Sequence, residues 1–396
     1  MISERTRVIS ALGLVMILTW GSTFYLLAVL SGPIQDETGW SAGEVTLGIS
    51  LGLLVSGLAA SRIGSLIQLE GGRRVLAAGT LLIAAGLALL GLAHSLTVYL
   101  IAWGILGLGM AAALYDAAFS TLGRLYGREA RSAITALTLW GGFASTVCWP
   151  ISAFLVENVG WRGTCFAYAA LHLTVTLPLC WYALPAGAPP VPAPSVSATV
   201  APDRSPGRFD LRFWCIACAG SALAMLASLW SVHLITILTA KGYALAAAVG
   251  LGTLIGPAQV GARVLEMLGR GRHHPIWTML VSTSLVLIGF VGLQWEFPAG
   301  AALVAYGAGN GLWSIARGAL PLAVFAPEDY ARIMGRLARP ALIASALAPL
   351  LGAMLIDAYG PHGLLGLLAL GALVPLGAAL VLAVELSRRA RSPALH

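Results

Sequence analysis

The sequence predicts an all-α integral membrane protein with twelve transmembrane helices in two pseudo-symmetric bundles of six. The chain is 58% hydrophobic and only 10% charged, with a mean hydropathy of +0.87, whereas soluble domains carry about 25% charged residues. Its apolar residues occur in runs of about 20, enough to cross about 30 Å of hydrocarbon at 1.5 Å per residue. The alternation of apolar and polar residues that is typical of membrane β-barrel strands is absent.

The apolar runs define the predicted spans. The first run follows a short charged start and has no small-residue cleavage site, so we expect a retained helix and not a signal peptide. The predicted spans cover 8–31, 42–68, 73–93, 97–122, 132–156, 163–184, 212–239, 243–268, 275–294, 299–325, 338–357 and 363–386.

Basic residues predict the orientation of these spans. The chain has 23 lysines and arginines, yet only Arg162 and Lys241 fall in loops on one side of the membrane, and Arg62, Arg263 and Arg317 fall within spans. The others lie in the remaining loops and at the two ends of the chain. Because cytoplasmic loops carry the excess of basic residues, this asymmetry predicts that both termini lie in the cytoplasm.

A segment rich in proline, alanine and serine divides the chain into halves. Residues 1–184 are expected to form an N-terminal six-helix bundle, 185–210 a cytoplasmic linker, and 211–396 a C-terminal six-helix bundle. Each half has a basic turn after its second span, GGRR in the first and GRGR in the second. This layout is typical of two bundles that rock about a binding site near the middle of the membrane.

The sequence resembles the major facilitator superfamily over its whole length. The stretch GSLIQLEGGRRV (64–75) occupies the position of that family's cytoplasmic signature between spans 2 and 3. Three further stretches resemble the monocarboxylate and oxalate/formate carriers of the family: GPIQDETGWS (32–41), WPISAFLVENVGWRGT (149–164) and QVGAR (259–263). The resemblance implies an alternating-access carrier, with Arg263 as a ligand of an anionic substrate.

Ionisable residues inside spans are costly in hydrocarbon and therefore mark pathways or partners. Span 8 carries Gln259, Arg263 and Glu266, whose spacing of four and three places them on one helix face. The guanidinium of Arg263 offers a planar set of donors that matches a carboxylate. The alternative is a structural ion pair between Arg263 and Glu266. Glu266 is also a candidate for proton coupling.

Spans 4 and 10 carry further candidates. Asp116 is a candidate proton-coupling residue, because a carboxylate among apolar residues takes up a proton more readily than one in water. Its alternative is a fixed ion pair with Arg263 or Arg62, and Tyr115 beside it is a candidate substrate contact. In span 10, Asn310 and Arg317 are seven residues apart on one helix face and are candidate substrate ligands.

Three other groups complete the expected sites. Tyr25 is a candidate substrate contact because span 1 lines the cavity in the family, although aromatic packing is equally expected. His233, flanked by Trp230 and Ser231, is a weaker candidate, since a lone histidine in an apolar span is more often packed in the core. The resemblance further implies a gating role for the signature stretch, through Gly64, Gln68, Gly72, Arg73 and Arg74.

These observations predict a proton-coupled secondary transporter of a small, anionic, monocarboxylate-like organic solute, acting as a monomer in a bacterial inner membrane. An exporter of drugs or toxic compounds and a carrier-like solute sensor remain open alternatives. No nucleophile–base arrangement, nucleotide-binding loop or metal-spaced cluster stands out, so we expect no enzyme activity, cofactor, metal or nucleic-acid partner. The five cysteines lie in apolar runs and predict no disulfide framework.

Overall fold

The computed structural model describes residues 3–186, 210–269, 272–295 and 297–391, and this part of the chain is helical apart from turns and short connections. It divides into two compact units. Unit 1 comprises Met1–Gly187 and Tyr330–Leu347, and unit 2 comprises Ala188–Asp329 and Ala348–His396. Nearly all of the predicted linker falls in 187–209, which lies outside the described residues.

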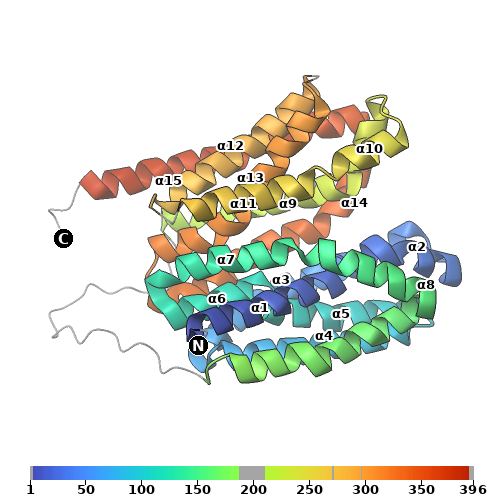
Figure 1. The fold of residues 1–396 in the computed structure, drawn as a ribbon. Helices are drawn as coiled ribbons and strands as arrows, with labels where there is room; N and C mark the ends of the chain where they lie inside the picture. The colour runs from blue at the N-terminus through green and yellow to red at the C-terminus, as the bar shows by residue number, and fades with distance from the viewer. Residues whose placement is uncertain (1–2, 187–209, 270–271, 296, 392–396) are drawn as a thin grey trace. The chain divides into compact units, whose positions relative to one another are not determined.

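Unit 1 contains the first six spans, several of which consist of two helices in sequence (Figure 1). Its elements are α1 (Glu4–Ser22), α2 (Leu27–Thr38), α3 (Ala42–Glu70), α4 (Gly72–Gly91), α5 (Leu96–Ala113), α6 (Tyr115–Tyr126), η1 (Gly127–Glu129), α7 (Ala130–Gly142), α8 (Ala144–Leu171), η2 (His172–Thr176) and η3 (Leu179–Ala183). The first part of α14 also belongs to this unit.

Unit 2 contains the remaining spans. Its elements are α9 (Leu211–Ala240), α10 (Leu245–Gly252), α11 (Ile255–Leu268), α12 (Pro275–Gln294), α13 (Ala299–Val324), η4 (Pro327–Asp329) and α15 (Leu373–Arg391). Helix α14 (Tyr330–Gly371) is shared, since its residues up to Leu347 belong to unit 1 and the rest belong to unit 2. Helix α13 packs against α12 and α11, and α15 packs against α9 and α12.

Seven helical stretches in the described part of the chain are long and apolar enough to cross a membrane. Two of them are long enough to cross more than once, Leu96–Ala183 with 88 residues and Pro327–Arg389 with 63. The first covers predicted spans 4 to 6 and the second covers spans 11 and 12. Predicted spans 8 and 10 correspond to α10 with α11 and to α13. The all-α prediction is therefore confirmed.

The two long stretches contain the same backbone feature. Gly160 in α8 has φ 69° and ψ 174°, and Gly360 in α14 has φ 69° and ψ 173°. Each marks the place where one helix ends and the next begins, and each lies in a similar sequence, GWRG or GPHG. The repeat of this turn in the two halves agrees with the predicted pseudo-symmetry.

Several spans that the sequence predicted as continuous are interrupted. Span 1 breaks between α1 and α2, where Thr23 has φ −124° and ψ −84°. Span 4 breaks at Leu114, with φ −89° and ψ −169°, and span 8 breaks between Gly252 and Ile255. Spans 5 and 12 are also divided, between α7 and α8 and between α14 and α15. Non-helical backbone at membrane depth is tolerated only where protein or a water-filled cavity surrounds it, and Thr23 and Leu114 are accordingly buried within unit 1.

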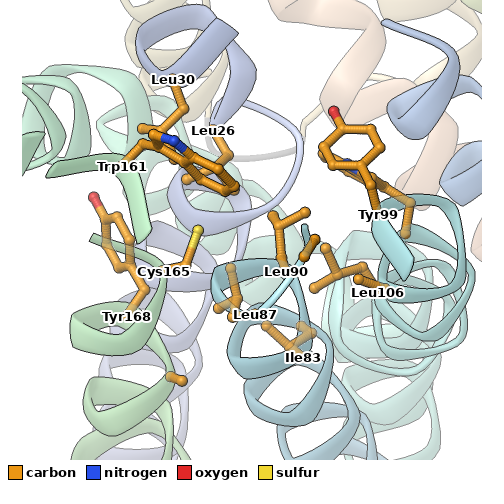
Figure 2. Packing of buried hydrophobic residues seen from close by; sticks show 14 of the residues in the cluster. Leu26, Leu30, Ile83, Leu87, Leu90, Tyr99, Leu106, Trp161, Cys165 and Tyr168 are labelled. Atoms are coloured by element: carbon orange, nitrogen blue, oxygen red, sulfur yellow. The ribbon is translucent and has the colours of Figure 1, made fainter. Parts of the chain in front are cut away.

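The part of span 1 after its break is fixed by a large apolar cluster (Figure 2). Leu26, which directly precedes α2, and Leu30 of α2 are fully buried and pack with Leu87 and Leu90 of α4 and with Trp161 of α8. Burial of a leucine side chain contributes about 1.5 to 3 kcal/mol. This packing holds α2 in place although the helix that precedes it has ended.

Arg162 fixes the same end of unit 1 through polar contacts. Its Nη1 donates to the carbonyls of Gly91 at 3.1 Å and Ala93 at 2.6 Å, just where α4 ends. Its Nε donates to Glu37 Oε1 at 2.8 Å, and its guanidinium lies 4.2 Å from the ring centroid of Trp161. A cation at a helix C-terminus is favourable because the last carbonyls carry partial negative charge. Arg162 thus joins spans 1, 3 and 6.

At the other end of unit 1, α3 packs directly against the first part of α14. Ser61 Oγ donates to the carbonyl of Gly335 at 3.3 Å. A Cβ atom at Gly64 would overlap the carbonyl oxygen of Ala331, and one at Gly335 would overlap that of Ala60. Only glycine allows this approach of the two backbones.

Gly64→Ala is expected to lower the melting temperature of the purified protein, because the added methyl group must force α3 and α14 apart, an overpacking that costs about 1 to 3 kcal/mol. Gly104→Ala is the matched control, since a Cβ at Gly104 meets no atom within 4 Å. The measurement is a thermal unfolding curve in detergent. Equal melting temperatures for the two variants would contradict the close contact.

Candidate functional site

The broken spans of unit 1 meet through aromatic side chains. Trp20 ends α1 and Tyr115 begins α6, and their ring centroids lie 5.2 Å apart. Tyr25, in the break of span 1, lies 6.1 Å from Trp149 of α8. Tyr115 is in turn stacked on Phe119 at 5.1 Å. With Phe24, these residues form what we call the aromatic cluster: Trp20, Phe24, Tyr25, Tyr115, Phe119 and Trp149.

The aromatic cluster borders a cavity of about 440 Å³ between α2 and α8. Ala28 and Val29 line it on one side, and Ser145, Thr146 and Trp149 line it on the other. Trp149 is 43% exposed. Trp20 Nε1 is buried and has no hydrogen-bond partner among the described residues. This side of unit 1 therefore offers aromatic surface, two hydroxyl groups and one buried donor.

Asp116 lies in the first turn of α6, directly after the break at Leu114, and is half-buried. Its neighbours Ala117 and Ala118 are buried and apolar.

A buried polar contact ties span 1 to span 6 beside the break. Ser22 Oγ and His172 Nε2 lie 2.7 Å apart, and both residues are fully buried. His172 begins the π-helical turn η2, and its Nδ1 has no hydrogen-bond partner among the described residues. The sequence alone contains no sign of this pairing, because the two residues are 150 positions apart.

In unit 2, Arg263 is buried on α11 with 6% exposure. Its Nε donates to the carbonyl of Gly311 at 3.3 Å and its Nη2 donates to Gln259 Oε1 at 3.3 Å. The second contact follows the i, i+4 spacing that the sequence suggested. One backbone carbonyl and one side-chain amide oxygen therefore orient the guanidinium.

Glycines bring α13 close enough for this contact. A Cβ at Gly311 would overlap the backbone of Gln259, and one at Gly307 would approach the carbonyl of Ile255 to 2.8 Å. Asn310 lies between these glycines and is half-buried. The GAGNG sequence therefore sets the distance between α11 and α13, and Arg317 lies two turns further along α13, also half-buried.

The structure adds partners for Glu266 outside its own helix. Thr278 Oγ1 donates to Glu266 Oε1 at 2.9 Å, and His273 Nε2 lies 3.1 Å from the same oxygen. This group connects α11 with the start of α12. His233 is 9% exposed, donates a hydrogen bond to the carbonyl of Pro349, and lies so close to Gly352 that no Cβ would fit there. His233 is therefore tightly packed against the second part of α14.

The residues of the signature stretch do not form one group. Gly64 contacts α14, whereas a Cβ at Gly72 would overlap Thr121 of α6. Gln68 Oε1 is buried without a hydrogen-bond partner in the described part of the chain. Arg73 lies over the ring of Trp181 at 4.8 Å, and Arg74 is exposed.

Sequence reasoning did not identify Phe119 and Trp149 as site residues, nor the pairing of Ser22 with His172. Phe119 stacks on Tyr115 one turn away in α6, and Trp149 contacts Tyr25 in the break of span 1. The sequence signal that could have suggested the break in span 4 is weak, since Ala113 to Tyr115 contains neither proline nor glycine.

Comparisons with known proteins address the fold and the family. No curated protein sequence matches the chain. Among solved structures, the human organic anion transporter MFSD10 (TETRAN) has a TM-score of 0.75 at 16% identity, covering 96% of this chain and 100% of that one. The E. coli fucose:proton symporter FucP has a TM-score of 0.69 at 14% identity, covering 96% and 99%. The proton:xylose symporter XylE has a TM-score of 0.69 at 11% identity, covering 94% of each chain.

The sequence matches the family model of the Major Facilitator Superfamily over residues 12–316. This match and the similar solved structures confirm the fold class that the sequence predicted, twelve spans in two six-helix bundles. The chain belongs to the major facilitator superfamily and is a multi-pass membrane transporter.

Proposed function

We propose that this transporter carries a small organic anion of the monocarboxylate type by alternating access, with Arg263 as the principal anion ligand. The similar solved structures are transporters of an organic anion, of fucose and of xylose. The fold alone therefore does not identify the substrate, and the proposal depends on Arg263. Its buried guanidinium, oriented by Gly311 and Gln259, is the observation that carries the proposal.

The physical reason is the energy of a buried charge. An arginine inside a span costs roughly 2.5 to 3.5 kcal/mol on insertion scales. Such residues are accordingly found where a partner or a substrate compensates for the loss of water. A guanidinium has five N–H donors, and a carboxylate binds two of them side by side.

Further residues are proposed as substrate contacts. In unit 2, Gln259, Asn310 and Arg317 lie on the two helices that contribute to the surroundings of Arg263, and His233 is a weaker candidate. In unit 1, Tyr25 and Tyr115 are the hydroxyl-bearing members of the aromatic cluster. We propose Arg317 as a second anion ligand and the other residues as contacts to the uncharged part of the substrate.

Proton coupling is proposed for Asp116, with Glu266 as a second candidate. Asp116 lies in the first turn of α6, directly after the break in span 4, and we propose that this carboxylate gains and loses a proton during transport. Glu266 already accepts a hydrogen bond from Thr278 and lies beside His273. We propose that the transport of the anion is coupled to protons. The carrier would act as a monomer in the inner membrane of a bacterium, with both termini in the cytoplasm.

A gating role is proposed for Gly64, Gln68, Gly72, Arg73 and Arg74. The contact of α3 with the first part of α14 joins helices that must separate if this side opens. The Gly64→Ala variant tests this role as well, because the added methyl group should weaken the contact between α3 and α14. In that variant, a cysteine placed at Ser61 should react faster with a thiol reagent.

The aromatic cluster favours one alternative, an exporter of drugs or toxic organic compounds. Aromatic surface binds planar apolar molecules of many shapes, and the neighbouring cavity is lined mainly by apolar groups. Under this alternative, cells that express the protein would resist a panel of toxicants, and the loss of Arg263 would leave that resistance unchanged.

Arg263→Ala is expected to lower the counterflow of formate, lactate or oxalate in proteoliposomes by about a hundredfold, because it removes a charged partner of the anion. Arg272→Ala is the control, since Arg272 is exposed at the start of α12. Circular dichroism and thermal unfolding check that both variants fold. Normal counterflow by a folded Arg263→Ala variant would contradict the proposal.

Asp116→Asn is expected to retain counterflow but to lose accumulation driven by a pH gradient, since exchange of substrate requires no net movement of protons. Uptake is measured in proteoliposomes with and without an imposed gradient. Glu157→Gln, an exposed carboxylate of unit 1, serves as the control and should accumulate substrate like the wild type. Full gradient-driven accumulation by Asp116→Asn would exclude this residue as the coupling site.

A further inference from the structure

A groove of about 480 Å³ lies on the surface of unit 1 between α4 and the end of span 6. Its apolar wall is formed by Ala77, Ala78 and Leu81 of α4, and Leu177 and Pro178 lie opposite. Leu81 is 46% exposed. From Arg74 to Leu81 the wall extends by about 10 Å along the helix.

One end of this groove carries positive charge and aromatic rings. Arg74 lines it directly, together with Trp181 and Tyr182 of η3, and Tyr182 is 79% exposed. The neighbouring Arg73 places its guanidinium 4.8 Å from the ring centroid of Trp181. The stacking fixes the plane of the guanidinium beside the groove.

The two arginines lack an acidic partner among the residues that the structure describes. They lie in the first turn of α4, which contains no acidic residue. A cation there is unfavourable, because the first turn of a helix carries partial positive charge. Arg73 Nε is buried without a hydrogen-bond partner, and neither arginine forms an ion pair with Glu70 or with another acidic residue in the part of the chain that the structure describes. The site therefore has the electrostatics of an anion-binding position.

We propose that this groove binds one anionic phospholipid, with its phosphate between Arg73 and Arg74 and an acyl chain against Ala78, Leu81 and Leu177. The groove is basic at one end and apolar along its wall, and this combination favours an anionic lipid. A small water-soluble anion would leave the apolar wall unused, and a neutral lipid would leave two cations uncompensated. Tryptophan and tyrosine beside basic residues are typical of the level of lipid headgroups.

This inference goes beyond the proposed transport function and depends on other residues. The groove involves neither Arg263 nor Asp116, and lipid binding is measured without any substrate. Arg73 and Arg74 were also proposed to act in gating, so the readout must be direct binding and not transport.

The test is native mass spectrometry of the detergent-purified protein, titrated with phosphatidylglycerol or with phosphatidylcholine of the same acyl chains. We expect the wild type to retain one phosphatidylglycerol and to prefer it over phosphatidylcholine. Arg73→Gln/Arg74→Gln should weaken retention by about tenfold or more. Ala78→Trp, which fills the apolar part and keeps both arginines, should weaken it as well.

The matched control is Arg7→Gln/Arg388→Gln, which removes the same charge from two exposed arginines outside the groove and should bind like the wild type. Three results would overturn the proposal: wild-type retention by the Arg73→Gln/Arg74→Gln variant, equal binding of phosphatidylcholine by the wild type, or a loss as large in the control as in the groove variants. Inorganic phosphate is added as a competitor. Its displacement of the lipid, together with wild-type binding by Ala78→Trp, would identify a simple phosphate site and contradict the lipid. If Arg73→Gln/Arg74→Gln fails to fold, Arg74→Gln alone and Ala78→Trp carry the same test, because Arg74 and Ala78 are exposed.

Discussion

The absence of water in the hydrocarbon core is the constraint on which the rest of this structure depends. Every backbone N–H and carbonyl within the membrane needs a partner from the protein, and a continuous helix provides one. Spans 1, 4 and 8 give up part of this pairing at Thr23, at Leu114 and before Ile255. The candidate residues Tyr25 and Asp116 lie at or directly after the breaks in spans 1 and 4, so these irregularities place polar side chains where helical hydrogen bonds are lost.

Arginine side chains recur at the ends of the helices with a common physical role. Arg124 donates to the carbonyl of Ile67 at the end of α3, Arg162 to that of Gly91 at the end of α4, and Arg212 to that of Val324 at the end of α13. Cations are favoured there by the helix dipole. Before α9, burial opposes the ionisation of Asp210, but hydrogen bonds from Arg212 and the charges of Arg212 and Arg389 outweigh it and lower the pKa of Asp210. Arginines at or beyond the ends of the predicted spans therefore stabilise the ends of the helices.

The fold class could be predicted from the sequence because hydrophobic runs and the placement of arginines are properties of single segments of the chain. The sequence also placed Gln259 and Arg263 on one helix face, where the structure shows a hydrogen bond between them, because that placement depends only on helical spacing. It did not predict the carbonyl of Gly311 as the second partner, the aromatic contact between Tyr25 and Trp149, or the broken spans. These features arise from packing between helices far apart in sequence, and Leu114 in particular has no residue type that signals a break.

The central claim is that the carrier recognises a negative charge through Arg263. The most direct measurement is the melting temperature of the purified protein with pairs of ligands that differ only in charge, a small carboxylic acid and its amide, because a ligand of the folded state raises apparent stability. We expect acids, but not amides, to raise the melting temperature of the wild type. Neither ligand should change the melting temperature of Arg263→Ala. Equal stabilisation by acids and amides, or full stabilisation of Arg263→Ala by acids, would contradict the central claim.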